Sequence, residues 1–317
     1  MTQIDKSRFE WIGSDSARRE GISRPSTTFW KDAIGRLMKN KVAVVCFFII
    51  VLLILSCIIV PFFSPFESRE QHLGEVNKGF MTVCTDSRYE GQHHVHYFGT
   101  DNLGRDLFLR AFEGGRVSLM IAFAAVFVNL IVGLIYGGIS GYIGGAVDTI
   151  MMRIVEIVNG IPYLIVVILL MMVLPKGIFT MVVAYGITGW TGMARLVRGQ
   201  VLQLKSQEYI VAAEAMGAKS SRIIAKHLIP NALSVIIINV TLAIPSAIFT
   251  EAFLSYIGLG VPVPQPSWGV LAKGGQYVFM TYPYQLVVPA VAISLTMLSF
   301  NLLGDGLRDA FDPRLRR

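Results

Sequence analysis

Long apolar stretches alternate with short polar ones along most of this chain. Six stretches have the apolarity of membrane spans, for which about 20 residues suffice to cross the hydrocarbon. Lipid offers the backbone no hydrogen-bond partners, so each stretch is expected to be helical. The alternation that a membrane β-barrel needs is absent. The six predicted spans are residues 42–63, 117–142, 154–174, 178–190, 232–256 and 286–303.

These spans differ in quality. Residues 42–63 form the cleanest, because no charge lies between Lys41 and Glu67. The 178–190 stretch is the weakest, since it is short and interrupted by Gly186 and Gly189, although it runs on towards residue 195. We therefore predict an all-α polytopic membrane protein with about six transmembrane helices.

Composition supports this prediction. Of the 317 residues, 53% are hydrophobic and 15% charged, and the mean hydropathy is +0.57. Soluble domains carry about a quarter charged residues, so the apolar excess here must face lipid. About forty mixed-charge residues precede the first span and no small-residue cleavage site follows it, which predicts an anchor rather than a cleavable signal.

The distribution of the net charge of +7 predicts the topology. If the first span runs outward, twenty Lys and Arg residues fall inside and eight outside. Cationic loops stay cytoplasmic, so both termini are predicted to be cytoplasmic. No basic run is interleaved with base-stacking aromatic residues, which argues against a nucleic-acid partner.

The spans divide the chain into segments. Within the first segment, residues 28–41 show helical periodicity, as expected either for a helix in the cytoplasmic interface or for a continuation of the first span. The predicted segments are 1–41, a cytoplasmic N-terminal segment with this helix; 42–63, the first transmembrane helix; 64–116, extracytoplasmic; 117–304, a five-helix core; and 305–317, a cytoplasmic tail.

The outer segment contains a run of histidines, His93, His94 and His96. No carboxylate or cysteine accompanies them at ligand spacing, so a solvated loop is expected and no metal or other cofactor is predicted for this chain. Cys46, Cys57 and Cys84 predict neither a disulfide framework nor a metal site.

A charged stretch follows the histidines. Asp106 and Arg110 are four residues apart and would face each other on a helix. Such a cluster could close the outer mouth of a bundle or dock a partner, and a surface salt-bridge network is the alternative. The residues singled out are Gly99, Thr100, Asp101, Gly104, Arg105 and Asp106.

Few ionisable groups fall within the spans. Glu156 is expected to pair with Arg153. Glu251 is expected near the outer surface, where its desolvation is partly relieved. No chain of buried acidic residues and histidines is present, which argues against a proton-coupled carrier. Pro162, Pro245 and several glycines mark places for kinks or close helix contacts.

The 195–230 loop is unusual for a connection between spans. Residues 207–216 favour a helix with a small alanine face, and Gly217 is suited to the left-handed turn that ends it. Ser220 or Ser221 is expected to cap a second helix reaching about His227, with Pro230 as its stop. Small residues before a sharp turn would let such a helix enter a groove on another protein.

The pattern Ala212-Ala213-x-x-x-Gly217, followed by His227-Leu228-Ile229-Pro230, resembles the EAA loop of binding-protein-dependent ABC importers. Val211 stands where the family has glutamate, and His227 and Ile229 replace aliphatic and leucine positions of its Ile-x-Leu-Pro ending. Four further stretches resemble the oligopeptide/dipeptide/nickel branch of this family, and most of all the C-type permease subunits of oligopeptide importers. They read GTDNLGRD, MARLVRGQ, FLSYIGLG and NLLGDGLRDAFDPR.

This resemblance implies a type I ABC importer permease fold in the bacterial cytoplasmic membrane. It implies a related second permease subunit, two cytoplasmic P-loop ATPases that use ATP and Mg²⁺, an extracytoplasmic solute-binding protein and a peptide substrate. The loop would be the coupling helix. Its implied ATPase-coupling residues are Ala212, Ala213, Glu214, Ala215, Gly217, Arg222, His227 and Pro230.

Other functions are less consistent with the sequence. Dipeptide, nickel and glutathione importers share this architecture and remain alternatives for the cargo. A membrane protease is disfavoured because HExxH, GxSxG and a buried pair of aspartates are absent. A channel leaves the 207–230 loop unexplained. The chain lacks GxxxxGK[ST], so ATP hydrolysis by the P-loop route requires a partner, and the chain itself is not expected to be an enzyme.

Overall fold

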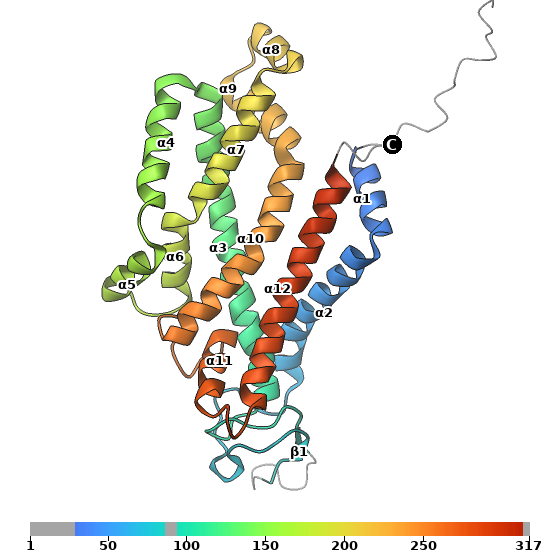
Figure 1. The fold of residues 1–317 in the computed structure, drawn as a ribbon, viewed down its shortest axis with the longest axis vertical. Coiled ribbons are helices and arrows are strands. Elements are labelled where there is room, and N and C mark those ends of the chain that lie inside the picture. The colour runs from blue at the N-terminus through green and yellow to red at the C-terminus, as the bar shows by residue number, and fades with distance from the viewer. Residues whose placement is uncertain (1–28, 86–93, 313–317) are drawn as a thin grey trace, which may run out of the picture.

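A computed structural model describes residues 29–85 and 94–312, and within these ranges the chain is a helical bundle (Figure 1). The predicted helical class is confirmed. The strands in the described part are β1 (Thr82–Val83) and β2 (Val95–His96), an antiparallel pair. His93, the 1–28 segment and the 313–317 end of the tail lie outside the described residues.

The helices follow one another with short connections. The first half contains α1 (Phe29–Lys39), α2 (Lys41–Phe63), the 3₁₀ turn η3 (Leu73–Glu75), α3 (Leu107–Ile143), α4 (Gly145–Asn159) and α5 (Tyr163–Val173). The second half contains α6 (Ile178–Thr188), α7 (Trp190–Lys205), α8 (Glu208–Ala215), α9 (Ser220–Ile223), the π turn η5 (Ile224–Leu228), α10 (Ile229–Ile257), α11 (Trp268–Tyr277) and α12 (Tyr284–Phe311).

Four helices in the described ranges are long and apolar enough to cross a membrane: Lys41–Phe63, Leu107–Ile143, Ser220–Ile257 and Tyr284–Phe311. The predicted 154–174 span is broken where Pro162 was expected to allow a kink, because α4 and α5 meet at a bend of 78°. Gly160 and Pro162 lie in the break, where Pro162 cannot donate a helical hydrogen bond. Taken as one span, the bent pair gives a fifth crossing.

The predicted 178–190 span divides at Gly189 into α6 and α7. Alone, the 11 residues of α6 extend about 17 Å, which is less than the roughly 30 Å of a bilayer core. A Cβ at Gly189 would lie 2.9 Å from Cγ of Asn129 on α3, so the junction sits tightly against that helix. The count of six spans and the cytoplasmic termini stay predictions.

Helix α3 is the central element of the bundle. It packs along α7 and also contacts α2, α6, α10 and α11. Gly133, Gly137 and Gly141 are one turn apart and permit the close approach to α7, as predicted for Gly133 and Gly137. A Cβ at Gly137 would lie 2.9 Å from Cβ of Val197 and 3.0 Å from the backbone nitrogen of Arg198.

A second contact region joins α3 to the C-terminal helices. Trp268 is almost fully buried, and its indole nitrogen donates to the Ala111 carbonyl at 2.9 Å. Around it lies an apolar cluster contributed by α2, α3, α10 and α12. Its members include Ile50, Ala122, Ile248 and Phe300.

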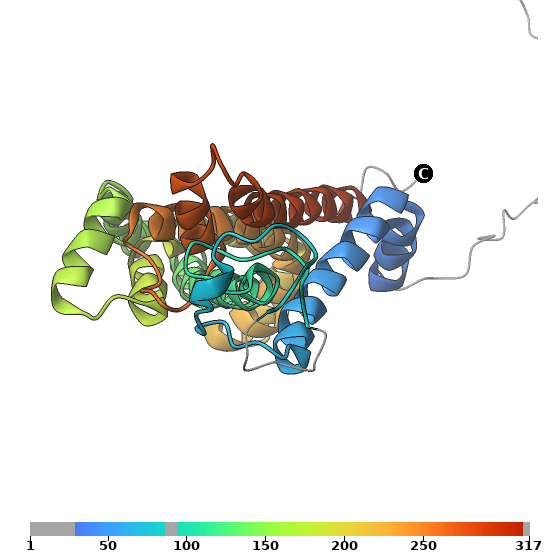
Figure 2. The same cartoon turned by 90° about the horizontal axis from the view of Figure 1, so that it is seen from below.

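The N-terminal helix α1 is distinct from α2. Asn40 separates them, and its side chain caps α2 by accepting from the Ala43 nitrogen at 3.2 Å. Trp30 packs edge-on against Phe311 of α12 with ring centroids 5.6 Å apart. Viewed along the bundle, α1 and α2 lie at one flank, with α4 and α5 at the other (Figure 2).

The two predicted functional regions lie at opposite ends of the long axis (Figure 1). Helix α8 projects beyond α4 and α7 at one end, whereas β1 and the loops before α3 lie at the other. The ends of α1 and α12 that meet at Trp30 and Phe311 point towards the α8 end. This arrangement agrees with the predicted separation of cytoplasmic and outer segments.

The glycine contact between α3 and α7 predicts that Gly137→Ala destabilises the chain. The added methyl group meets the backbone of α7, and overpacking of this kind typically costs about 1–3 kcal/mol. Gly199→Ala on α7 is the matched control, because no atom lies within 4 Å of a Cβ there. Thermal unfolding of the purified chain in detergent should show a lower melting temperature for Gly137→Ala alone. Equal melting temperatures for both variants would contradict the close contact.

Candidate functional site

The 207–230 loop has the predicted helix–glycine–helix form. Helix α8 ends at Ala215, and Gly217 takes the left-handed conformation with φ +77°. The Ala218 nitrogen then donates to the Ala213 carbonyl at 3.1 Å, which closes the turn. The prediction for Gly217 is confirmed, and the turn is of the kind that ends helices at glycine.

Buried apolar side chains hold this loop on the bundle. Ile210 of α8, Ile223 of α9 and Leu228 of η5 are fully buried. They form one cluster with Val197 and Val201 of α7 and with residues at the start of α10. Both halves of the loop are therefore anchored to the ends of α7 and α10.

The two alanines of the motif face different ways. Ala212 is exposed, but Ala213 is 5% exposed, because it lies three residues after Ile210 on the side that faces the bundle. Ala213 therefore supports α8 from within, contrary to the surface position implied for it. Four other residues of the motif are exposed, namely Ala212, Glu214, Ala215 and Gly217.

Large apolar side chains extend this outward face. Met216 is 82% exposed and Val211 54%, and Tyr209 is also exposed. An apolar surface at the tip of a helical turn is typical of a contact with another protein. The sequence analysis missed these residues, although apolar side chains on a short polar loop were a usable signal.

The second helix of the loop differs from its prediction. Lys219 occupies the N-cap of α9, so neither Ser220 nor Ser221 caps it. Pro230 is exposed but does not stop the helix, since the chain is helical from Ser220 to Ile257. The π turn η5 explains this: Ile229 donates to the Ile224 carbonyl, five residues back, just before the proline that lacks a donor.

The remaining motif residues lie along this second helix. Arg222 is exposed, and His227 is half-buried. The His227 carbonyl accepts a hydrogen bond from the Asn231 side chain at 2.6 Å. Within the described residues, no hydrogen bond links Arg222 or His227 to the alanines of α8.

A polar clamp that the sequence analysis did not find lies beneath the loop. Asp148 of α4 forms two hydrogen bonds with Arg198 of α7, both 2.5 Å long, and Ser140 of α3 donates to the same carboxylate at 2.5 Å. Lys205 donates to the Tyr142 carbonyl at 2.5 Å. These contacts fasten three helices at the end that carries α8. The predicted local pair of Arg153 and Glu156 is confirmed at 2.6 Å.

At the opposite end, residues 64–85 and 94–106 form a folded segment, called the cap below. Within the predicted outer motif, Asp101 accepts from the Leu103 and Arg105 nitrogens at 2.9 and 3.0 Å, and the Arg105 side chain donates to its second oxygen at 2.7 Å. Thr100 is fully buried. Gly99 and Gly104 have φ of +76° and +73°, a backbone conformation that favours glycine.

Asp106 and Arg110 do not pair as predicted. Asp106 caps α3 by accepting from the Leu109 nitrogen at 2.7 Å, and its other oxygen lies 2.7 Å from Nδ1 of His96. Arg110 is 1% exposed and donates to the Ser68 carbonyl at 2.6 Å. The capping position turns the aspartate away from the helix surface. Because these charges are buried, the alternative of a surface salt-bridge network is wrong.

The expectation of a solvated histidine loop is wrong for His96, which is fully buried. Its Nε2 lies 3.1 Å from a Glu75 oxygen. Burial disfavours the charged imidazole, but the hydrogen bonds and charges of Asp106 and Glu75 outweigh it and raise the pKa of His96 above its usual value. His94 is half-buried.

The cap rests on the bundle through hydrogen bonds to α12. The Tyr284 hydroxyl donates to the Lys78 carbonyl at 2.7 Å, and the Gln285 amide donates to the Asn77 side chain at 2.8 Å. A cavity of about 550 Å³ opens beside this contact, lined among others by Asp101, Arg105 and Lys273. The predicted motif thus borders the outer mouth of the bundle.

Glu251 of α10 is not partly solvated as predicted, because the side chain is fully buried. Ser255 donates to one carboxyl oxygen at 2.7 Å, and the other has no hydrogen-bond partner in the described part of the chain. Beside it, Gly269 of α11 packs closely on α10, since a Cβ there would lie 2.7 Å from Cα of Ala252 and from Cβ of Ser255. Sequence position alone did not reveal this packing.

The clamp predicts that Asp148→Asn destabilises the α8 end of the bundle. Loss of the carboxylate leaves Arg198 without a charged partner, at an expected cost of about 1–3 kcal/mol. Glu156→Gln is the control, since the Arg153–Glu156 pair is 72% and 58% exposed and such pairs contribute about 0–1 kcal/mol. Thermal unfolding in detergent should show a distinctly larger loss for Asp148→Asn, and similar small losses would contradict the clamp.

Comparisons with known proteins agree over both halves of the chain. The family model described as binding-protein-dependent transport system inner membrane component matches residues 129–317. A second model, the N-terminal TM domain of oligopeptide transport permease C, matches residues 28–79. The 207–230 loop lies within the first match and part of the cap within the second.

Curated relatives match over nearly the full length. The oligopeptide transport system permease protein OppC of Bacillus subtilis is 49% identical, with 100% of both chains covered. The dipeptide transport system permease protein DppC of the same organism is 48% identical, covering 94% of this chain and 90% of the relative. OppC of Escherichia coli K12 is 42% identical over 99% of both.

A solved structure supports the fold. A chain of the MetNI methionine ABC transporter in an inward-facing conformation superposes with a TM-score of 0.51 and 20% sequence identity. The match covers 63% of this chain and 94% of that chain. At this identity the likeness concerns the fold, which is that of a type I ABC importer permease.

Proposed function

This chain belongs to the family of binding-protein-dependent transport system inner membrane components, and from this premise we propose that it carries oligopeptides inward as one permease subunit of an ATP-driven importer. It is a multi-pass protein of the bacterial cytoplasmic membrane and a transport component rather than an enzyme. The outward face of α8 is the observation that carries the proposal, since it offers small and apolar residues to a partner without any catalytic group of its own.

The geometry supplies a route from the loop to the membrane. Because Ser220–Ile257 is one helix of 38 residues, a displacement at its first turn moves a rod about 57 Å long. The clamp of Asp148 and Arg198 passes the same displacement to α4 and α7. An ATPase that closes against Ala212, Ala215 and Met216 would therefore re-orient several helices together.

The π turn η5 is where this rod can adjust. Its wider hydrogen-bond pattern, at residues 224–228, interrupts the α-helical ladder just before the proline. Leu228 is fully buried, so the turn remains seated against the bundle. Because the buried cluster holds this turn in place, we expect a displacement of the loop to pass through it to the rod.

The chain would work with several partners. Two cytoplasmic P-loop ATPases supply the ATP and Mg²⁺ chemistry, because this chain lacks GxxxxGK[ST]. A related second permease subunit completes the membrane path, and a solute-binding protein delivers substrate to the outer mouth, beside the cavity bordered by Asp101 and Arg105. Lipid surrounds the apolar helices, and nucleic acid is not expected to bind.

Oligopeptides are the proposed cargo because relatives named as oligopeptide permeases match the full chain at 49% and 42% identity. The dipeptide permease relative, at 48%, keeps dipeptides as the second candidate. Nickel and glutathione importers share the architecture, and no relative described above bears those names.

Crosslinking tests the coupling surface. The native cysteines Cys46, Cys57 and Cys84 are buried, so surface thiols can be introduced at Glu214 and Met216 without removing them. In a complex assembled with candidate ATPase subunits, both variants should crosslink to the ATPase with a yield that changes on adding ATP. The chain with native cysteines alone should give no such crosslink.

Phe80→Cys in the cap is the matched control, because Phe80 is 55% exposed at the opposite end. A membrane-impermeant thiol reagent should label Phe80→Cys in whole cells and leave Met216→Cys unlabelled. Labelling of Met216→Cys from outside would overturn the topology. ATP hydrolysis by the purified chain alone would overturn the assignment to a permease.

Uptake by the reconstituted importer tests the cargo. Vesicles containing both permease subunits, the ATPases and the binding protein should accumulate labelled peptides longer than dipeptides when ATP is supplied. Met216→Asp should reduce uptake at least about tenfold, because it buries a charge at the proposed contact with the ATPase. Changing a central residue of a protein–protein interface typically costs about 2 kcal/mol or more of binding free energy. Uptake of dipeptides alone would contradict the oligopeptide proposal.

A further inference from the structure

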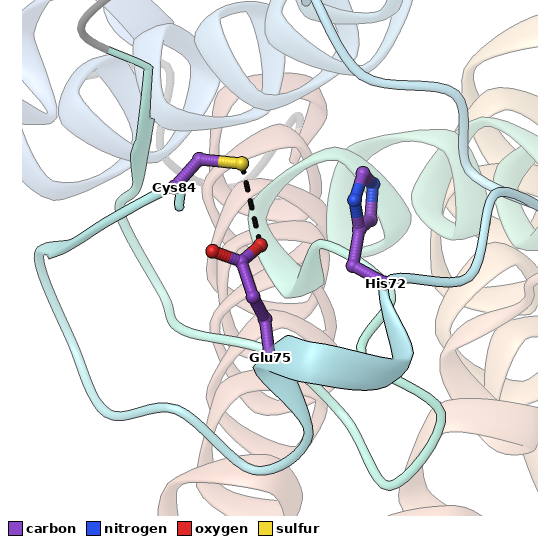
Figure 3. Close-up of side chains that lie close together, drawn as sticks. All are labelled: His72, Glu75 and Cys84. Atoms are coloured by element: carbon purple, nitrogen blue, oxygen red, sulfur yellow. Dashed lines mark hydrogen bonds between the residues drawn. The ribbon is translucent and has the colours of Figure 1, made fainter. Parts of the chain in front are cut away.

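Three side chains that are able to ligate a metal, all within residues 72–84, meet inside the cap. His72 precedes η3, Glu75 ends it, and Cys84 follows β1 (Figure 3). They are 2%, 2% and 8% exposed. One ligand atom from each lies within 4.8 Å of the other two.

The spacing of these atoms suits a small divalent cation. An ion held at about 2.0–2.3 Å from each ligand atom places the ligand atoms roughly 3–4 Å apart. The Cys84 sulfur already lies 3.3 Å from a Glu75 oxygen. Small changes of side-chain torsion would bring the imidazole of His72 to the same distance, since all three groups belong to a short stretch of cap.

The kinds of ligand atom indicate which metal the site would bind. Thiolate and imidazole ligands with one carboxylate are typical of Zn²⁺ and disfavour Mg²⁺ and Ca²⁺, which take oxygen ligands. We propose that His72, Glu75 and Cys84 form a structural zinc site in the extracytoplasmic cap. A water molecule would complete the tetrahedral set.

The surroundings resemble the supporting shell of a metal site. Nε2 of His96 lies 3.1 Å from Glu75, and Nδ1 of the same ring lies 2.7 Å from Asp106. The Thr85 hydroxyl donates to the other Glu75 oxygen at 3.1 Å. Such outer hydrogen bonds orient a ligating carboxylate and fix the histidine that adjoins it.

The aromatic side chain of Phe66 covers one side of the cluster. Phe66 is 6% exposed, stacks on His96 with centroids 4.5 Å apart and meets His72 edge-on at 5.9 Å. Removal of water strengthens the attraction between a cation and its anionic ligands. The site thus combines buried donors with an apolar lining.

The zinc ion would hold the cap together. It joins the chain at η3 to β1, and through His96 and Asp106 the same cluster reaches the N-terminus of α3. A segment of this length with two short strands has a small apolar core of its own. Metal binding contributes folding free energy to such segments.

The proposed ligands differ from the residues of the histidine run in the sequence. The histidine run pointed to His93, His94 and His96, whereas the geometry selects one histidine from before η3, with a glutamate and a cysteine. His93 lies outside the described residues. The proposal also replaces the expectation that the chain binds no metal.

Cobalt substitution tests the site directly. The full-length chain, purified with its partner subunits in detergent and stripped with a chelator, is titrated with Co²⁺ and followed by absorption. We expect one Co²⁺ per chain, a thiolate-to-cobalt charge-transfer band and the intense visible bands of tetrahedral cobalt, all removed by Zn²⁺. Cys84→Ser should abolish the charge-transfer band and weaken binding at least about tenfold.

Matched variants separate this site from other thiols and histidines. Cys57→Ser removes a buried cysteine of α2 and should leave the cobalt spectrum unchanged. His72→Gln should retain the charge-transfer band while weakening binding. Zn²⁺ should raise the melting temperature of the native chain and of Cys57→Ser, and leave that of Cys84→Ser unchanged, provided each variant elutes as a folded complex.

The opposite results would overturn the proposal. Cobalt that binds without a thiolate band, or with the same affinity in Cys84→Ser, would exclude Cys84 as a ligand. If the chelated native chain neither binds Co²⁺ nor gains stability from Zn²⁺, the cluster is a hydrogen-bonded network in which the Cys84 thiol donates to Glu75. Should Cys84→Ser not fold, His72→Gln carries the same test through its loss of zinc-dependent stabilisation.

Discussion

The close packing of α3 against α7 is the contact on which the rest of the bundle depends. Glycines one turn apart on α3 let the two backbones approach, and in lipid this kind of packing replaces the hydrophobic driving force that soluble helices have. Once α3 is fixed, its two ends define the two functional regions. Asp106 caps its N-terminal end within the cap, and Ser140 near its C-terminal end joins the clamp of Asp148 and Arg198.

Polar interactions are concentrated at those ends because desolvation is costly between them. Arg110 and Asp101 are buried where the cap meets the bundle, and the Asp148–Arg198 pair lies beneath α8. Glu251 is the exception, fully buried within α10 and bonded to Ser255. The bundle therefore has an apolar middle between two polar regions at its opposite ends.

The loop that carries α8 is both anchored and exposed. Ile210, Ile223 and Leu228 hold it to the bundle, while Ala212, Ala215 and Met216 face outward. Because α9 continues into α10 without a stop, the exposed surface and a membrane-spanning rod form one mechanical unit. A loop that was only flexible could bind an ATPase, but it could not transmit force to the spans.

Local patterns in the sequence determined the class of protein, the approximate spans, the turn at Gly217 and the family resemblance. Hydropathy and glycine chemistry act over a few residues, so these features need no knowledge of the whole fold. The inward position of Ala213 and the continuous helix through Pro230 depended on what lies beside each segment. Apolarity in a membrane protein does not distinguish a lipid contact from a protein contact, which is why burial could not be predicted.

Only the tertiary structure decided which distant polar residues meet. Asp148 and Arg198, which pair, are 50 residues apart in the sequence. Asp106 pairs with His96 and not with Arg110, which is nearer in the sequence, because a side chain that caps a helix turns back along the chain. His72 and Cys84 come together through the folding of the cap around Phe66. The sequence by itself determined how each segment folds locally, whereas the partners of buried charges and thiols follow from the packing of whole elements, which no local pattern encodes.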